Sequence, residues 1–239
     1  MNPYRDPSIL PMTKRLTTIT KRVVAPAAVA AALALACLSS AHAADRKAPP
    51  PRPASEYPAH DSHPNEHVTI AIDPCDNQRD CEFFRLTYVA HSMIPIRIII
   101  TNDGDTALTL DDARMQFISA NNDRIPAADL EELNRRLFTI RSAQSQKLPI
   151  IPIPIHHTPV DKKITDDDHD FGFQGTIVNA HSTLAGYLFY DIKALDQPAL
   201  RHAEIYVKMI HTLDQKKELF AFTIPLDKWL AAQPNPTKP

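Results

Sequence analysis

Residues 94–100 read Ile94-Pro95-Ile96-Arg97-Ile98-Ile99-Ile100, and this stretch decides the fold. Isoleucine stands at positions 94, 96, 98 and 100, so these four side chains share one face of an extended chain. Ala203, Ile205, Val207 and Met209 alternate with polar residues in the same way. Both stretches predict half-buried β-strands.

Further strands are predicted from short runs of apolar and β-branched residues separated by polar turns. They cover residues 67–72, 82–90, 107–110, 114–120, 183–191 and 218–224, the last with Phe220, Phe222 and Ile224 on one face. Asn102-Asp103-Gly104-Asp105 lies between two of these runs, which favours a hairpin and antiparallel pairing. About eight short strands with polar turns predict an all-β fold, a two-sheet antiparallel sandwich.

One helix is predicted inside this series of strands, over about residues 126–138. Pro126 suits a first helical turn, acidic residues come early, and Arg135 and Arg136 come late, as the helix dipole favours. We expect this inserted helix to cover a sheet edge. A second, short helix is predicted at Pro225–Lys228, and Trp229 follows it as a side chain that closes one end of the sandwich.

Two segments carry a resemblance to a known class of domain. They are Ile98 to Leu110, IIITNDGDTALTL, and Val178 to Asp191, VNAHSTLAGYLFYD. Together they resemble the immunoglobulin-like domains of uncharacterised secreted bacterial proteins, which pair a turn after a core strand with a later Gly-x-Leu-Phe strand. The resemblance implies an immunoglobulin-like sandwich and carries no activity.

The first 43 residues have the pattern of an export signal. Basic residues precede a short apolar run from Ala27 to Leu38, and Ala41-His42-Ala43 predicts cleavage between Ala43 and Ala44. Met12 begins a signal peptide of more typical length and is an alternative start. The signal predicts a periplasmic or extracellular protein. Lipidation of Cys37 is the alternative reading, and membrane attachment is expected only in that case.

Removal of this leader changes the charge of the chain. The leader holds five of the 26 basic residues and one of the 28 acidic residues, so the mature chain has a net charge of about −6. Without a basic block to neutralise phosphates, nucleic acid is not an expected partner. Prolines and polar residues dominate residues 44–66 and 232–239, which predicts a disordered linker and tail around a domain at residues 67–231.

Two cysteines, Cys75 and Cys81, remain after the leader. An even number of cysteines in an exported protein favours a disulfide bond. The five residues between them are polar and suit a small closed loop, whereas the spacing differs from that of Cys-x-x-Cys redox pairs. A structural disulfide is therefore predicted.

The segment 148–174 is irregular and has the most suggestive chemistry. Its acidic run places carboxylates at Asp166, Asp168 and Asp170, but Phe171 and Ile177 stand where an EF-hand loop needs glycine and glutamate. These carboxylates remain candidate ligands for calcium. His156, His157 and His169 are candidate ligands for zinc or copper, although their spacing matches no known zinc motif.

No sequence motif of a hydrolase nucleophile or a phosphate-binding loop is present, so the chain is not expected to be an enzyme and no cofactor is implied. We expect a non-catalytic binding or structural protein of the bacterial cell envelope, with an envelope protein or polymer as its partner. Ile151, Ile153 and Ile155 alternate with prolines and form a candidate interaction edge. The alternative is a periplasmic metal-binding protein.

Overall fold

The computed structural model describes residues 49–77, 79–144 and 159–233, with backbone only for residues 138–144. The predicted leader, its Ala43–Ala44 cleavage site and Cys37 lie outside the described residues. The same is true of the candidate edge at Ile151, Ile153 and Ile155, and of His156 and His157. No helix in the described part is long and apolar enough to cross a bilayer.

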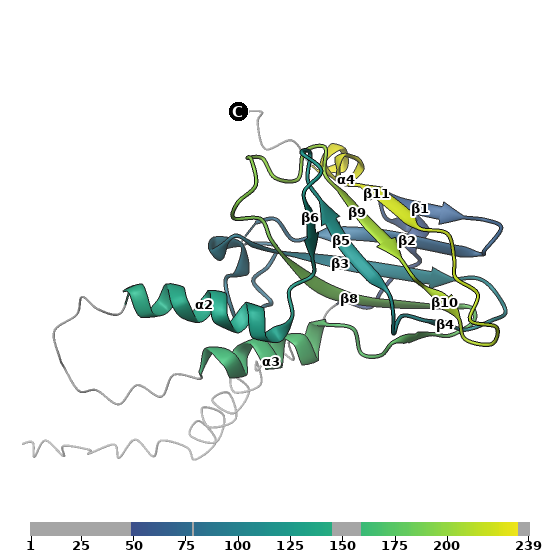
Figure 1. Cartoon of the computed structure of the whole chain (residues 1–239), viewed down its shortest axis with the longest axis horizontal. Coiled ribbons are helices and arrows are strands. Elements are labelled where there is room, and N and C mark those ends of the chain that lie inside the picture. Colours follow the sequence, from purple (N-terminus) through teal and green to yellow (C-terminus); the bar gives the residue numbers. More distant parts are fainter. Residues whose placement is uncertain (1–48, 78, 145–158, 234–239) are drawn as a thin grey trace, which may run out of the picture. The chain divides into compact units, whose positions relative to one another are not determined.

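The strands form three antiparallel sheets, which confirms the prediction of an all-β fold (Figure 1). The first sheet has the strand order β1-β2-β3-β8, comprising β1 (Ala59–His63), β2 (Val68–Pro74), β3 (Met93–Asn102) and β8 (Ser182–Asp191). The second has the order β11-β9-β5-β6, comprising β11 (Phe222–Pro225), β9 (Glu204–Lys208), β5 (Arg114–Ile118) and β6 (Arg124–Pro126). A small third sheet comprises β10 (His211–Thr212), β4 (Leu108–Thr109) and β7 (Ile177–Val178).

The main hydrophobic core joins the inner faces of the two four-stranded sheets. The first sheet contributes the alternating isoleucines of the opening stretch together with those of β2, and the second contributes apolar residues of β5, β9 and β11. The central members are fully buried, namely Ile70, Ile72, Ile96, Ile98, Phe117, Ile205, Val207, Phe222 and Ile224. Because each such side chain contributes about 1.5–3 kcal/mol when it leaves water, this alternation decides which strand faces are inside.

The outer face of the first sheet is buried as well, so β3 is covered on both sides rather than half-buried. Residues 49–57, which include the 3-10 helix η2 (Ala54–Glu56), run over this face. Ala54 and Tyr57 pack on Ala71 and Ile99, and the Ala54 backbone N–H donates to Thr101 Oγ1 at 2.8 Å.

Residues 54–63 therefore belong to the folded unit, in contrast to the disordered linker predicted over 44–66. The few apolar side chains of this proline-rich segment suffice because the sheet face beneath them is made of small residues such as Ala71 and Ala185. β1 pairs with β2 over five residues, which satisfies the backbone of a strand with a polar sequence.

The first and last strands of the described chain meet along one side of the molecule. Asp61 Oδ2 accepts a hydrogen bond from the Thr223 backbone N–H at 2.9 Å, and Glu66 Oε1 accepts one from the Phe220 backbone N–H at 3.0 Å. The His63 ring stacks on Phe222 with 3.8 Å between ring centroids. We call this contact between β1 and β11 the terminal seam.

A second core joins residues of β3 and β8 to the helices α2 (Leu130–Gln144) and α3 (Val160–Phe171), whereas α4 (Leu226–Ala232) packs in the main core. The second core comprises the disulfide-bonded Cys75 and Cys81, aromatic residues that follow them, and apolar residues of α2 and α3. Phe84 contacts Phe171, Tyr187 and Phe189, with ring centroids 5.0–5.6 Å apart. The disulfide prediction is confirmed, and this bond holds the chain that builds the second core.

Three predicted elements differ from those observed. Residues 82–90 form turns and lead into the 3-10 helix η3 (Tyr88–His91), because the adjacent residues Phe83 and Phe84 both pack in the second core, which breaks the alternation of a strand. The helix predicted from Pro126 begins at Leu130, since Pro126 pairs with Gln116 in β6 and Asp129 Oδ1 accepts the Glu132 N–H at 2.7 Å. The acidic run lies on α3 instead of a loop.

The predicted last strand and the predicted hairpin also differ from the observed structure. β11 begins only at Phe222, so Phe220 lies outside the strand and is 77% exposed. A turn forms after β3, where Asn102 Oδ1 accepts the Gly104 N–H at 3.0 Å, but β3 and β4 belong to different sheets and form no hairpin. The short C-terminal helix is confirmed as α4 (Leu226–Ala232), with Trp229 4% exposed.

Candidate ligand-binding cleft

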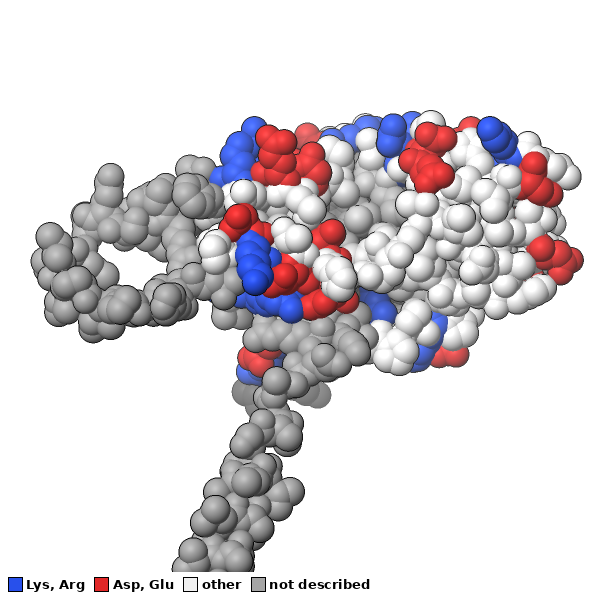
Figure 2. All heavy atoms as spheres, turned by 90° about the horizontal axis from the view of Figure 1, so that it is seen from below, with Lys and Arg blue, Asp and Glu red and all other residues white. Residues whose placement is uncertain are grey.

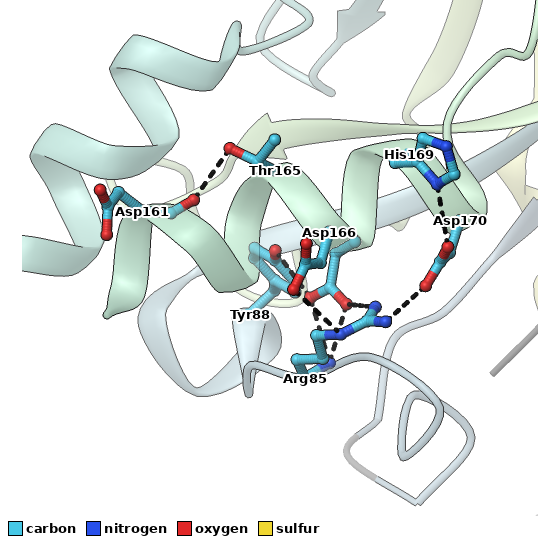
Figure 3. Close-up of polar contacts among 8 residues, drawn as sticks. Arg85, Tyr88, Asp161, Thr165, Asp166, His169 and Asp170 are labelled. Atoms are coloured by element: carbon cyan, nitrogen blue, oxygen red, sulfur yellow. Dashed lines mark hydrogen bonds and ion pairs between the residues drawn. The ribbon is translucent and has the colours of Figure 1, made fainter. Parts of the chain in front are cut away.

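The candidate metal ligands of the acidic run lie on α3 and contact an arginine (Figure 3). Arg85 Nη2 donates to Asp170 Oδ2 at 2.5 Å, and Arg85 Nε lies 3.9 Å from Asp166 Oδ2. His169 and Asp170 are hydrogen-bonded to each other at 3.1 Å. Hydrogen bonds from His169 and Arg85 hold the pKa of Asp170 below its ordinary value, whereas burial raises the pKa of Asp168.

Asp167, which sequence reasoning did not single out, is the centre of this cluster. Its carboxylate is fully buried and accepts hydrogen bonds from the Arg85 backbone N–H at 3.0 Å, from Arg85 Nη1 at 2.9 Å and from Tyr88 Oη at 3.0 Å. Burial raises the pKa of Asp167, and burial together with the Asp167 charge raises that of Tyr88. The sequence did contain a pattern that points to Asp167. Asp167 stands at helical spacing with the apolar residues Val160, Ile164 and Phe171, and all four form one buried stripe of α3.

The arrangement of these carboxylates is that of a structural anchor. An arginine fills the space where a cation would sit, and the anchor fastens the segment after the disulfide to α3. In the described part of the chain, no three His, Cys, Asp or Glu side chains are grouped so that they could hold a metal ion. His156 and His157 lie outside that part, so a metal site that includes them stays a prediction.

A cleft of about 720 Å³ lies at the end of the sheets where α4 packs. Its wall is built by four segments distant in sequence: the start of the disulfide loop, η3 with the first residues of β3, the connection from β8 to β9, and α4. Apolar residues dominate the lining, namely Val89, Ile94, Ile192, Pro198, Ala199, Leu200, Leu230 and Ala231. This volume lies within the usual range of small-molecule sites, about 300–1,000 Å³.

Polar groups are confined to a few positions of this cleft: Asp76, Gln197, Arg201, His202 and Asp227. His202 and Asp227 are tied together twice, because Asp227 Oδ1 accepts the His202 backbone N–H at 3.0 Å and Asp227 Oδ2 lies 3.0 Å from His202 Nδ1. The backbone of His202 is left-handed, with φ of 57°, a conformation that histidine tolerates better than most residues. The hydrogen bond from the His202 backbone is the largest cause that lowers the pKa of Asp227.

This pairing determines what the imidazole of His202 offers to a ligand. A carboxylate at Nδ1 requires a proton on that nitrogen, so Nε2 is the free position of the ring. Arg201 precedes His202 and is exposed, and its guanidinium makes no hydrogen bond or ion pair with the residues described. The cleft thus combines an apolar wall with a guanidinium and one available ring nitrogen.

A smaller cavity of about 320 Å³ lies beside β5 and is lined by Met115, Phe173 and Leu188 among others. Arg114 is its only ionisable lining residue. The larger cleft therefore offers more polar groups that could orient a ligand. Acidic and basic side chains are intermixed at the helical end of the face shown in Figure 2, and much of the remaining face is uncharged.

Comparisons with models of protein families, with characterised protein sequences and with solved structures found no match to this chain.

Proposed function

We propose that this chain is an exported, non-catalytic binding protein of the bacterial cell envelope, and that it holds its ligand in the 720 Å³ cleft. The cleft carries the proposal, because a wall of apolar side chains with a few polar groups is the usual construction of a small-molecule site. The sequence contains no motif of a hydrolase nucleophile or a phosphate-binding loop, and no serine, threonine or cysteine lines the cleft beside His202 and Asp227.

The proposed fold is an immunoglobulin-like sandwich of two sheets. Two four-stranded antiparallel sheets that share one hydrophobic core support it, and the small third sheet extends the far end. The disulfide between Cys75 and Cys81 supports export, because such bonds form and persist in oxidising compartments. Placement in the periplasm or outside the cell follows from the leader pattern together with this bond.

Export is tested by expressing the whole chain in a bacterium and measuring, by mass spectrometry, the intact mass of the protein from the periplasmic fraction. We expect a mature N-terminus at Ala44 and the loss of two thiol hydrogens from Cys75 and Cys81. A mass that starts at a lipid-modified Cys37 would place the protein on a membrane instead. An uncleaved chain in the cytoplasm with free thiols would overturn export.

Binding in the cleft is tested with a matched pair of substitutions on α4. Ala231 lines the cleft and is exposed, whereas its neighbour Ala232 is exposed and is not a lining residue. Ala231→Phe should therefore fill the cleft without disturbing the core. Ala232→Phe should leave both the cleft and the core unchanged. We expect native mass spectrometry to detect a small molecule that co-purifies with the wild type and with Ala232→Phe only. Equal retention by Ala231→Phe, or no bound molecule in the wild type, would contradict the proposal.

A further inference from the structure

The wall of the cleft selects an apolar ligand body. Ile94, Ala199 and Leu200 are buried, and Val89, Ile192 and Leu230 are half-buried, so these side chains are partly open to whatever occupies the cleft. Removing such surface from water yields about 25 cal/mol per Å², which favours an aliphatic or aromatic occupant.

The charged groups of the cleft differ in the hydrogen bonds and ion pairs that they already make within the protein. Both oxygens of Asp227 are engaged by His202, and Asp76 Oδ1 accepts a hydrogen bond from Asn77 Nδ2 at 3.2 Å. Asp76 is also exposed to solvent, which screens its charge. The Arg201 guanidinium makes no hydrogen bond or ion pair with the described residues, and its charge interacts with the Asp227 carboxylate only through space.

A guanidinium whose N–H donors make no hydrogen bond with the described residues favours a planar anion as its ligand. Its five N–H donors form a rigid fork that matches the two oxygens of a carboxylate, and it is more weakly hydrated than an ammonium group. His202 lies next in the chain and also lines the cleft, and its Nε2 makes no hydrogen bond with the described residues.

We propose that the cleft binds monocarboxylates with an apolar body, with the carboxylate on Arg201 and the body against Ile94, Ile192, Leu200 and Leu230. The inference rests on the proposed binding function and names the chemical class of its ligand.

The only tryptophan of the chain provides the measurement. Trp229 lies on α4 between the cleft residues Asp227 and Leu230, and its Nε1 donates to Asp73 Oδ1 at 3.2 Å. Binding is followed by Trp229 fluorescence and, independently, by calorimetry. The probes are octanoate, 1-octanol and octylamine, which share one chain and differ in their head group.

We expect saturable binding of octanoate at least about tenfold tighter than that of 1-octanol, a difference of about 1.4 kcal/mol. Arg201→Gln should remove this preference, because it weakens octanoate binding far more than 1-octanol binding. Lys193→Gln is the matched control, because Lys193 is an exposed cation of the same connection that does not line the cleft. Ala231→Phe should weaken all binding, and Ala232→Phe should not.

Three results would overturn this inference: tighter binding of octylamine than of octanoate, an unchanged octanoate affinity in Arg201→Gln, or no saturable signal for octanoate by either method. None of these results tests whether the cleft binds a ligand at all. That question is answered by the separate experiment, in which a small molecule co-purifies with the wild type and is absent from Ala231→Phe. Failure of the ligand class and failure of the cleft as a binding site are therefore distinguishable.

Discussion

Asp167 is the most constrained single residue of the described chain. A fully buried carboxylate is tolerated because Arg85 and Tyr88 supply all of its hydrogen bonds. Removing it leaves a guanidinium that is only 24% exposed without its one fully buried carboxylate partner. The residue therefore fixes the position of α3 more firmly than any of the acidic residues that the sequence first suggested as metal ligands.

For Asp167→Ala we expect the free energy of unfolding to fall by about 3 kcal/mol, the lower end for a broken buried ion pair, because Arg85 retains some contact with water. Urea unfolding of the wild type and the variant measures this change in the free energy of unfolding. The control is Asp166→Ala, whose carboxylate is 39% exposed and 3.9 Å from Arg85, and which should cost less than about 1 kcal/mol. Equal losses of unfolding free energy in the two variants would mean that burial of the Asp167 carboxylate does not add to its contribution to stability.

Gly186 is required by a close approach of two chain segments. A Cβ atom at this position of β8 would lie 2.4 Å from the backbone nitrogen of Phe173, which has no freedom to move away. We expect Gly186→Ala to lower the free energy of unfolding by about 1–3 kcal/mol, as overpacking does. Gly175→Ala is the control, since no atom lies within 4 Å of its Cβ position. Thermal unfolding of the two variants compares them, and a stable Gly186→Ala protein would contradict the observed packing.

At the scale of elements, α3 is docked by charges that depend on pH. Hydrogen bonds from His169 and Arg85 lower the pKa of Asp170 in the folded state, so the unfolded chain takes up the proton first as the pH falls. The stability that Asp170 contributes is therefore complete above its unfolded pKa of about 4 and is lost as the pH falls through its folded pKa.

We accordingly expect Asp170→Asn to reduce the free energy of unfolding at pH 7 and to have a smaller effect near pH 2.5, measured by urea unfolding at both values. Asp112→Asn is the control, because Asp112 is an exposed carboxylate between β4 and β5 with no hydrogen bond or ion pair to the described residues. A larger effect of Asp170→Asn in acid would reverse the sign of this argument.

The elements also show which parts of the structure could be predicted from the sequence. Period-two alternation located β3 and β9, because one face of each strand meets the main core. Residues 82–90 escaped prediction because Phe84 and Tyr88 pack on helices that arrive about 80 residues later. The cleft was not foreseen either, since His202 and Asp227 lie 25 residues apart and only the folded chain brings them together.

At the scale of the whole molecule, the folded unit includes the residues before the predicted boundary at residue 67. Residues 49–57 cover the outer face of the first sheet, and β1 covers the free edge of β2. A chain that began at His67 would expose Ala71 and Ile99 and leave the terminal seam without Asp61 and Glu66.

We predict that a chain beginning at Pro49 keeps the stability of the mature protein, whereas one beginning at His67 unfolds at a lower temperature and aggregates through the exposed edge of β2. Both are compared behind the same leader by thermal unfolding and size-exclusion chromatography. Equal stability of the two chains would restore the boundary expected from composition.

The terminal seam has a consequence for how the chain matures. β1 and β11 are separated by about 160 residues, and Asp61 contacts the backbone of Thr223 across 162 positions. Because the N-terminal strand is synthesised first, the seam cannot close before β11 is present, whatever β1 pairs with in the meantime. The His63 ring gains its stacking partner Phe222, and Asp61 and Glu66 gain their amide donors, only after residues 220–223 have arrived. Closure of the seam thus reports that β11 is present, and a product that ends before Phe220 keeps an open side that a protease can recognise.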